Sequence, residues 1–299
     1  MRSASRPVVP LLVSLGLVAT VAACSPADTG DPQGATEAPT SLASSSVPTG
    51  SGSGSPGGTD RVPVGPSDPQ PTRGTVEVVG SFDHDPTLFT QGLEVEGEEI
   101  YESTGGYGSS EVQRRPLGEV DPTVRVPMAD EEFGEGLTFT DDTLWTLTWR
   151  NGVAHNRDPR TLEVRSVARY DGEGWGLCHD GERLVMSDGS DQLTFRDPVT
   201  FEPTGTMRVT AGGTPVTRLN ELECTDGTVL ANVWKSDEIV RIDPSTGAVT
   251  AIYDTSELER PRPDDPEAVL NGIAALPDSE NLLVTGKLWT RLYEVRLVD

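Results

Sequence analysis

Side chains that bind transition metals are scarce in this sequence. Its 299 residues include only three cysteines and three histidines. The histidines, His84, His155 and His179, have no partner at the spacing of a metal-binding motif, and no CxxC pair occurs. The sequence therefore excludes zinc chemistry.

Long apolar segments are also scarce. Residues 8–21 form an apolar run of about 14 residues, shorter than the roughly 20 that cross a bilayer. Arg2 and Arg6 precede this run, and the small residues Val21-Ala22-Ala23 lead directly into Cys24. The pattern is typical of a signal peptide and resembles a bacterial lipobox. We expect a lipoprotein signal peptide over residues 1–23 and diacylation of Cys24, with an ordinary signal peptide as the alternative.

The next segment is poor in large apolar residues. Residues 24–74 are rich in Ser, Thr, Gly and Pro, a composition that cannot bury enough surface to offset the entropy of ordering. We expect a disordered tether there and one folded domain over residues 75–299. The protein would then lie outside the cytoplasm, on the outer face of the cell membrane as a lipoprotein, or secreted if Cys24 is not lipidated.

Positive charge is the minority sign, and the formal net charge is −25. Such a field repels nucleic acid and anionic membranes and attracts cationic ligands. We expect a monomer that binds no nucleic acid and contacts the membrane only through the lipid anchor. A soluble surface suited to a salty or acidic setting explains the charge equally well.

A short motif recurs through the domain. Its middle residues are 44, 40, 45 and 51 positions apart, and its copies are Gln91-Gly92-Leu93, Glu135-Gly136-Leu137, Trp175-Gly176-Leu177, Asn220-Glu221-Leu222 and Asn271-Gly272-Ile273. Alternating runs and polar turns such as Asp180-Gly181 follow each copy, as in β-hairpins. Four short strands in each unit of 40–50 residues are typical of a β-propeller. We therefore predict an all-β fold, a five-bladed β-propeller rather than a six-bladed one.

The first residue of each copy is polar or aromatic, where an inner strand would ordinarily carry a small or β-branched residue. If each copy begins the innermost strand of a blade, these side chains face one mouth of the central funnel. Trp149 and Trp234, each 13 residues after the middle residue of a copy, should return to the same rim. A concave ring of carboxylate, amide and indole groups predicts a ligand site.

Individual residues within this ring suit different roles: proton transfer, wall formation or positive charge. Glu135 stands between two glycines, and desolvation by aromatic walls would raise its pKa and suit it to proton transfer; a solvated rim carboxylate is the alternative. Trp175 joins Trp149 and Trp234 as a wall residue, whereas Trp145 better suits the core. Of the two lysines, Lys287 is the better site candidate, and Lys235 should point to the opposite face of its strand.

Strings in every repeat resemble the plant and bacterial glutaminyl-peptide cyclotransferases. They include FTQGLEV, FGEGLT, LTWRNG, EGWGL, LNELE and ANVWKSD, and they run from about Gly80 to Leu297. The resemblance implies a five-bladed propeller that converts N-terminal glutamine of peptides and proteins to pyroglutamate and releases ammonia. It implies Glu135 as the catalytic residue, with a substrate site made of Phe89, Gln91, Phe133, Trp149, Trp175, Asn220, Trp234 and Lys287.

The implied reaction needs no cofactor and no protein nucleophile, because the substrate's α-amine attacks its own γ-amide. The family can also carry a structural calcium ion in the central tunnel, which this sequence does not reveal, so the metal content stays open. A noncatalytic surface propeller that binds peptides or sugars is the main alternative function. A metal-dependent propeller lactonase is a second one.

Two cysteines remain once Cys24 is set aside. Cys178 and Cys224 each lie two residues before an Asp-Gly turn in neighbouring repeats. Because thiols tend to pair in an oxidising compartment, we expect a disulfide between them.

The anchor can be tested by removing the lipidated thiol. A Cys24→Ser variant should no longer partition into the detergent phase, because it cannot be acylated, while its folded domain is unchanged. Phase partitioning of the expressed protein measures this. A variant that stays in the detergent phase would show that something else holds the protein to the membrane.

Overall fold

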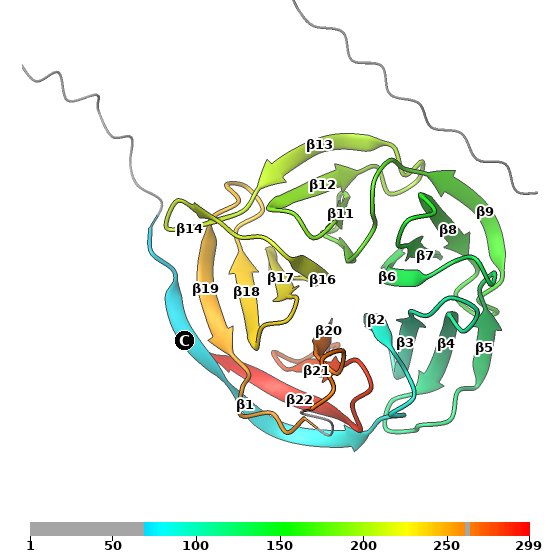
Figure 1. Cartoon of the computed structure of the whole chain (residues 1–299), viewed down its shortest axis with the longest axis horizontal. Coiled ribbons are helices and arrows are strands. Elements are labelled where there is room, and N and C mark those ends of the chain that lie inside the picture. Colours follow the sequence, from blue (N-terminus) through cyan, green and yellow to red (C-terminus); the bar gives the residue numbers. More distant parts are fainter. Residues whose placement is uncertain (1–68, 261–263) are drawn as a thin grey trace, which may run out of the picture. The chain divides into compact units, whose positions relative to one another are not determined.

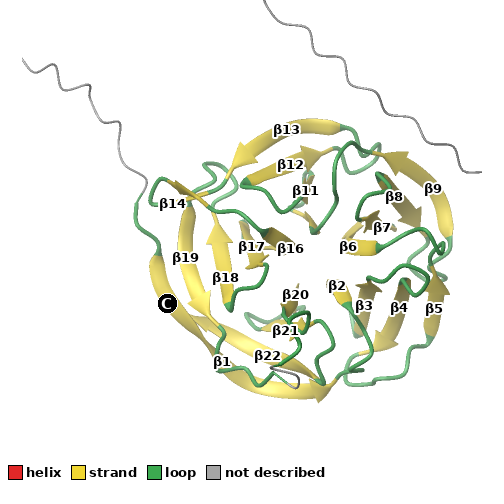
Figure 2. Cartoon of the chain, in the orientation of Figure 1, coloured by secondary structure: helices red, strands yellow, loops and turns green. Residues whose placement is uncertain are grey.

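The computed structural model describes residues 69–260 and 264–299. The expected signal peptide, Cys24 and most of the expected tether lie outside these residues. All regular elements in the described part are β-strands, which confirms the all-β prediction (Figure 2). A search of the same part for helices suited to crossing a membrane found none.

Three sheets each contain four strands in chain order, joined as antiparallel meanders. The first sheet holds β2 (Thr90–Glu96), β3 (Glu99–Thr104), β4 (Glu111–Pro116) and β5 (Val124–Pro127). The second holds β6 (Gly134–Thr140), β7 (Thr143–Thr148), β8 (Val153–Arg157) and β9 (Val164–Arg169). The third holds β10 (Leu177–His179), β11 (Leu184–Met186), β12 (Gln192–Arg196) and β13 (Pro203–Arg208).

A larger sheet has eight strands in the order β16-β17-β18-β19-β1-β22-β21-β20. Its strands are β16 (Leu219–Thr225), β17 (Thr228–Val233), β18 (Glu238–Ile242), β19 (Val249–Asp254), β1 (Thr72–Asp83), β22 (Arg291–Val298), β21 (Leu282–Gly286) and β20 (Leu270–Ala275). A separate two-stranded ribbon is formed by β14 (Thr210–Ala211) and β15 (Thr214–Pro215).

Strand β1 joins the two ends of the described chain. It pairs antiparallel with β22, the last strand, and parallel with β19. Because β1 begins at Thr72, residues 72–74 belong to a strand, although the sequence analysis placed them in the tether. The parallel pairing has no local sequence signature, since its partners are far apart in the chain.

The strands that carry the recurring motif form the inner ring of a nearly closed barrel of sheets (Figure 1). Strand β2 contacts β6 and β20, β10 contacts β6 and β16, and β16 contacts β20, so the contacts return to their starting point. Apolar residues fill the space between neighbouring sheets; for example, Val185 of β11 and Leu222 of β16 belong to one buried cluster.

The motif glycines allow the inner strands to approach closely. A Cβ atom on Gly136 would lie 2.6 Å from the backbone nitrogen of Leu177, and one on Gly176 would overlap the backbone of Asn220. The gap between β6 and the start of β10 is closed by a hydrogen bond from the Gly136 N–H to the Trp175 carbonyl, at 2.7 Å. The recurring glycine is therefore a packing requirement of the ring.

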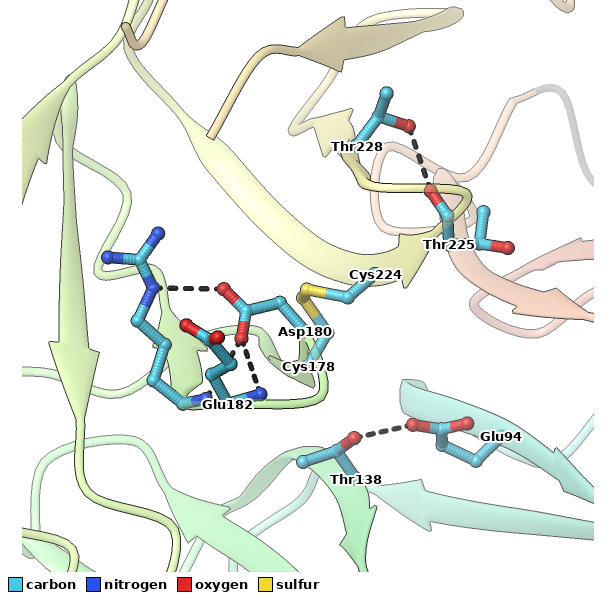
Figure 3. Close-up of a disulfide and its surroundings, with 9 residues drawn as sticks. Glu94, Thr138, Cys178, Asp180, Glu182, Cys224, Thr225 and Thr228 are labelled. Carbon is cyan, nitrogen blue, oxygen red and sulfur yellow. Dashed lines mark hydrogen bonds and ion pairs between the residues drawn. A yellow bond between two sulfur atoms is a disulfide. The ribbon is translucent and has the colours of Figure 1, made fainter. Parts of the chain in front are cut away.

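A disulfide links two of the inner strands. Cys178 of β10 and Cys224 of β16 are bonded, with their Cα atoms 5.4 Å apart (Figure 3). The bond joins strands of different sheets, as the sequence analysis expected for neighbouring repeats. In the same view Thr138 of β6 donates a hydrogen bond to Glu94 of β2, at 2.6 Å.

One charged group is buried in the first sheet with a full set of partners. Glu102 accepts hydrogen bonds from Thr90 at 2.7 Å, Arg115 at 2.7 Å and Gln113 at 3.3 Å. Its carboxylate also lies 3.1 Å from Nε2 of His84. Burial lowers the pKa of His84, but the charge and hydrogen bond of Glu102 outweigh this effect and raise it. Burial raises the pKa of Glu102, and the charges of His84 and Arg115 more than reverse that rise.

Removing this carboxylate should destabilise the fold strongly. Glu102→Ala leaves Arg115 buried without its acceptor, and breaking such a buried pair costs about 3–5 kcal/mol in free energy of unfolding. The control is Glu238→Ala, which removes the partner of Arg73 from an exposed ion pair at 2.6 Å and should cost less than about 1 kcal/mol. Urea denaturation at pH 7 measures both. Equal losses in the two variants would contradict the role of the network.

Candidate active site

The nine site residues implied by the family resemblance line one cavity. It has a volume of about 250 Å³, and its lining residues are Phe89, Gln91, Phe133, Glu135, Trp149, Trp175, Asn220, Trp234, Glu267 and Lys287. Glu267 is the one member that the sequence analysis did not name. The cavity thus brings together residues that are up to 198 positions apart in the chain.

Hairpin geometry places these side chains at one rim. Gln91, Glu135 and Asn220 lie at the starts of β2, β6 and β16, and Trp175 lies just before β10. Phe89 and Phe133 lie directly before β2 and β6, and three more residues follow the ends of second strands: Trp149 after β7, Trp234 after β17 and Lys287 after β21. In an antiparallel pair the start of one strand lies beside the end of its partner, as the pairing of Gly134 with Thr148 shows.

Asn271 carries the fifth copy of the motif but does not line the cavity. It is fully buried, and its side-chain amide donates to the Thr90 carbonyl at 3.0 Å and to Oε1 of Gln91 at 3.3 Å. Gln91 in turn donates from Nε2 to Oε1 of Glu135, at 2.8 Å. Asn271 therefore supports the site without lining it, because it orients the side-chain amide of Gln91, which holds Glu135.

Glu135 is a buried carboxyl group with a free oxygen. Its side chain belongs to a residue that is 4% exposed, and Oε2 has no hydrogen-bond partner among the described residues. Burial raises the pKa of Glu135 well above its ordinary value; the charge of Lys287 acts against this rise, and the charge of Glu173 adds to it. A carboxyl group in this state can exchange a proton with a ligand near neutral pH.

Lys287 is the cation of the cavity. Its ammonium group lies 4.7 Å from the centre of the Phe89 ring. Burial lowers the pKa of Lys287 to about 8, although the charges of Glu135 and Glu267 act in the opposite direction. Lys287 and Glu135 therefore each favour the charged form of the other across the cavity.

Aromatic rings make the walls. Phe133 packs edge-on against Phe89 and Trp149, with ring centres 6.0 and 5.6 Å apart. Trp175 and Trp234 form a second perpendicular pair at 5.6 Å. Such walls exclude water and attract ammonium groups through their electron-rich faces.

Comparisons with known proteins agree with this geometry. Residues 58–297 match the model of the glutamine cyclotransferase family. The chain belongs to this family. It is 40% identical over 227 residues to the glutaminyl-peptide cyclotransferase of Arabidopsis thaliana, a match that covers 74% of this chain and 71% of the relative. It also matches the crystal structure of glutaminyl cyclase from Myxococcus xanthus, with a TM-score of 0.73, 38% identity, and coverage of 77% of this chain and 99% of that one.

Sequence reasoning missed two carboxylates of this glutamine cyclotransferase site: Glu267, which lines the cavity, and Glu173, which contacts two lining residues. Glu267 follows β19 in a long connection with no recurring motif, so nothing local marks it. Glu173 is part of the EGWGL string, two residues before Trp175, and it contacts both Trp149 and Trp175. Its place next to a motif residue was the one available indication.

Two other predictions about single residues can be compared with the structure. Trp145 is 2% exposed and packs in an apolar cluster, which confirms its core role. The prediction for Lys235 was wrong. It follows the end of β17 with a left-handed backbone (φ 60°), so strand alternation does not apply, and its ammonium group lies 4.7 Å from the centre of the Trp234 ring.

The coupling of Lys287 to Glu135 can be measured directly, because the chain has only two lysines. With ¹³C-labelled lysine, the NMR signal of Lys287 should titrate at about pH 8, and Lys287→Arg assigns it. In Glu135→Gln the same signal should titrate at a lower pH, because the carboxylate that favours the ammonium form is gone. An unchanged titration in Glu135→Gln would contradict the coupling.

Proposed function

We propose that this protein is a glutaminyl-peptide cyclotransferase, which converts the N-terminal glutamine of peptides and proteins to pyroglutamate and releases ammonia. One observation carries the proposal: a carboxyl oxygen of Glu135 that has no hydrogen-bond partner among the described residues is buried in a small aromatic cavity. The chemistry of the reaction needs such a group, and the names of the similar proteins agree with it.

The reaction balances with the groups at hand. The substrate's α-nitrogen forms a bond to its own γ-carbonyl carbon, and the bond from that carbon to the amide nitrogen breaks. Glu135 removes a proton from the attacking amine and delivers one to the departing nitrogen, which leaves as ammonia. The carboxyl group ends in its starting form, so one residue serves both transfers.

The other lining residues position and stabilise. The walls of the cavity hold the glutamine side chain folded, so that amine and carbonyl meet as in an intramolecular reaction. Asn220 and Lys287 supply an amide and an ammonium group for the negative charge that develops on the γ-carbonyl oxygen. Gln91 fixes the Glu135 carboxyl group through its 2.8 Å hydrogen bond.

We also propose that the barrel is a five-bladed propeller. In this interpretation the eight-stranded sheet counts as two blades, β16 to β19 and β20 to β22 with β1 as the outermost strand. The order of strands supports it, because each half repeats the four-strand meander of the other sheets, and only the parallel pairing of β1 with β19 joins the halves. An experimental structure with two separate sheets at this place would agree with it, and a sixth meander would refute it.

For location and assembly, we propose a monomer held outside the cell membrane by a lipid on Cys24. The residues before the domain support the anchor, as described above, and they lie outside the described part of the structure. A tethered monomer leaves the cavity free for chains with a glutamine N-terminus. Light scattering of the Cys24→Ser protein tests the monomer, and a dimer would refute it.

A calcium ion in the central tunnel is consistent with the inner-ring carboxylates. Glu221 and Glu223 are buried there and Glu94 is partly buried. Burial raises the pKa of all three, the charge of Glu223 adds to the rise for Glu221, the charge of Glu94 adds to it for Glu223, and Oε2 of Glu223 has no partner among the described residues. In the described residues no three acidic, His or Cys side chains converge on one point, so backbone carbonyls would have to complete the shell. Such an ion would stabilise the ring, and calorimetric titration showing no calcium binding would refute it.

Glu135→Gln isolates the proton-transfer role. Glutamine keeps the size of the side chain but cannot exchange a proton, so kcat for a Gln-initiated dipeptide should fall by about 10²–10⁴ while KM changes little. Thermal stability should hold or rise slightly, because a carboxyl group whose ionised form is poorly solvated in this cavity is removed. Ammonia release measures the activity, and it also separates this enzyme from a noncatalytic propeller or a lactonase.

The matched control is Glu131→Gln, an exposed carboxylate four residues upstream that does not line the cavity. It should retain wild-type kinetics. A Glu135→Gln enzyme whose kcat stays within a few-fold of wild type would refute the role of Glu135, and a wild-type protein that releases no ammonia would refute the activity.

A further inference from the structure

Glu173 lies in the connection between β9 and β10 and contacts two wall residues of the cavity without lining it. Its Oε2 atom accepts hydrogen bonds from both Trp149 and Trp175, whose indole nitrogens lie 2.8 and 3.0 Å away. Its Oε1 atom accepts a hydrogen bond from Arg150, at 2.8 Å. One carboxylate therefore holds two wall residues of the cavity.

The two indoles belong to different sheets. Trp149 follows β7 of the second sheet, and Trp175 precedes β10 of the third. Two backbone hydrogen bonds join their loops, from the Gly174 N–H to the Trp149 carbonyl at 2.9 Å and from the Tyr170 N–H to the Gly152 carbonyl at 3.0 Å. The guanidinium group of Arg150 adds a further restraint, because it stacks over the Trp149 ring at 3.7 Å while it pairs with Glu173.

Each indole has a single N–H donor and no acceptor. Without Glu173 both donors would lose their partner, and the rings could adopt other rotamers that satisfy the N–H with water. The walls would then no longer match the folded substrate. The carboxylate stays ionised at neutral pH, because hydrogen bonds from Trp175, Arg150 and Trp149 outweigh its partial burial and lower its pKa.

We propose that Glu173 is a positioning residue of the cyclisation reaction, one that fixes the indoles of Trp149 and Trp175 as walls of the substrate cavity. The inference rests on the proposed function of that cavity. Glu173 contacts the two rings rather than the reacting atoms, so it acts through them.

Glu173 has a second effect that separates this role from a merely structural one. Its negative charge raises the pKa of Glu135 above the value that burial alone would set. Removing the charge should therefore lower the pKa of Glu135, and the acid limb of kcat/KM should move to lower pH, because Glu135 then stays ionised further into the acid range.

Three variants test the proposal in the full-length protein with a Gln-initiated dipeptide. Glu173→Ala should raise KM about tenfold, the effect of one lost net hydrogen bond to a charged group, and lower kcat less. Glu173→Gln keeps an acceptor oxygen, so its KM should stay within about threefold of wild type. Both should show the shifted acid limb, since both remove the charge.

Glu99→Ala is the matched control. Glu99 pairs with Arg114 at 2.9 Å and its side chain is 32% exposed, whereas Glu173 pairs with Arg150 at 2.8 Å and its side chain is 35% exposed. Among the described residues Glu99 makes no side-chain hydrogen bond to a residue that lines the cavity. It should leave KM and the pH profile unchanged. If Glu173→Ala has the KM and acid limb of this control, the proposal is overturned.

A structural readout keeps the test valid if the enzyme proves inactive on every Gln-initiated peptide. In that case the proposed function fails, and crystal structures of wild type and Glu173→Ala decide the positioning role alone. Rotated indoles at Trp149 and Trp175 in the variant would support it. Indoles in unchanged positions would overturn it.

Discussion

The inner strands approach one another so closely that no side chain fits between them at the motif glycines. At Gly136 the neighbouring backbone occupies the place where a Cβ atom would stand. This spacing removes the room for side chains between strands and directs the residues before Gly136 and Gly176 toward the cavity. Glu135 and Trp175 are presented to the cavity for this reason. The site is therefore a consequence of how the ring closes.

Glu221, the one motif position without glycine, shows how the ring accommodates a side chain between inner strands. It occupies the place that glycine holds in the other copies of the motif, and its carboxylate accepts a hydrogen bond from the backbone N–H of Ile273, at 2.8 Å. The side chain thus spans to the neighbouring inner strand, where the other copies use direct backbone approach. The price is a buried acid whose pKa is raised by burial and by the charge of Glu223.

The repeats made the all-β ring and most of the site predictable. The spacing of the motif located the inner strands, and the strand–turn–strand pattern located Trp149 and Trp234 at their rim. What could not be predicted depends on contacts between distant segments. Glu267 lies in a connection without a motif. Lys235 itself has a left-handed backbone conformation, so the alternation of side chains along a strand does not predict where it points. The pairing of β1 with β19 likewise joins segments that share no local signature.

Two buried glutamates show that neighbours, not burial, decide what an acid does in this fold. Glu102 is as deeply buried as Glu135, yet cationic and hydroxyl partners from β2 and β4 lower its pKa, and it serves stability. Among the described residues Glu135 has one amide partner and one oxygen without a partner, and its pKa is raised. The direction of neither pKa shift can be inferred from the residue type, because the partners of each carboxyl group lie on other strands.

The aromatic walls are held by a negatively charged group near the site. Tryptophan offers a large apolar face, but its N–H needs an acceptor, and for Trp149 and Trp175 that acceptor is the carboxylate of Glu173. Its charge favours the protonated form of Glu135, whereas the charge of Lys287 favours the ionised form. A group that must accept a proton and then return it works best when neither form is strongly preferred. In the proposed mechanism, the opposed charges of Glu173 and Lys287 therefore let Glu135 perform both transfers.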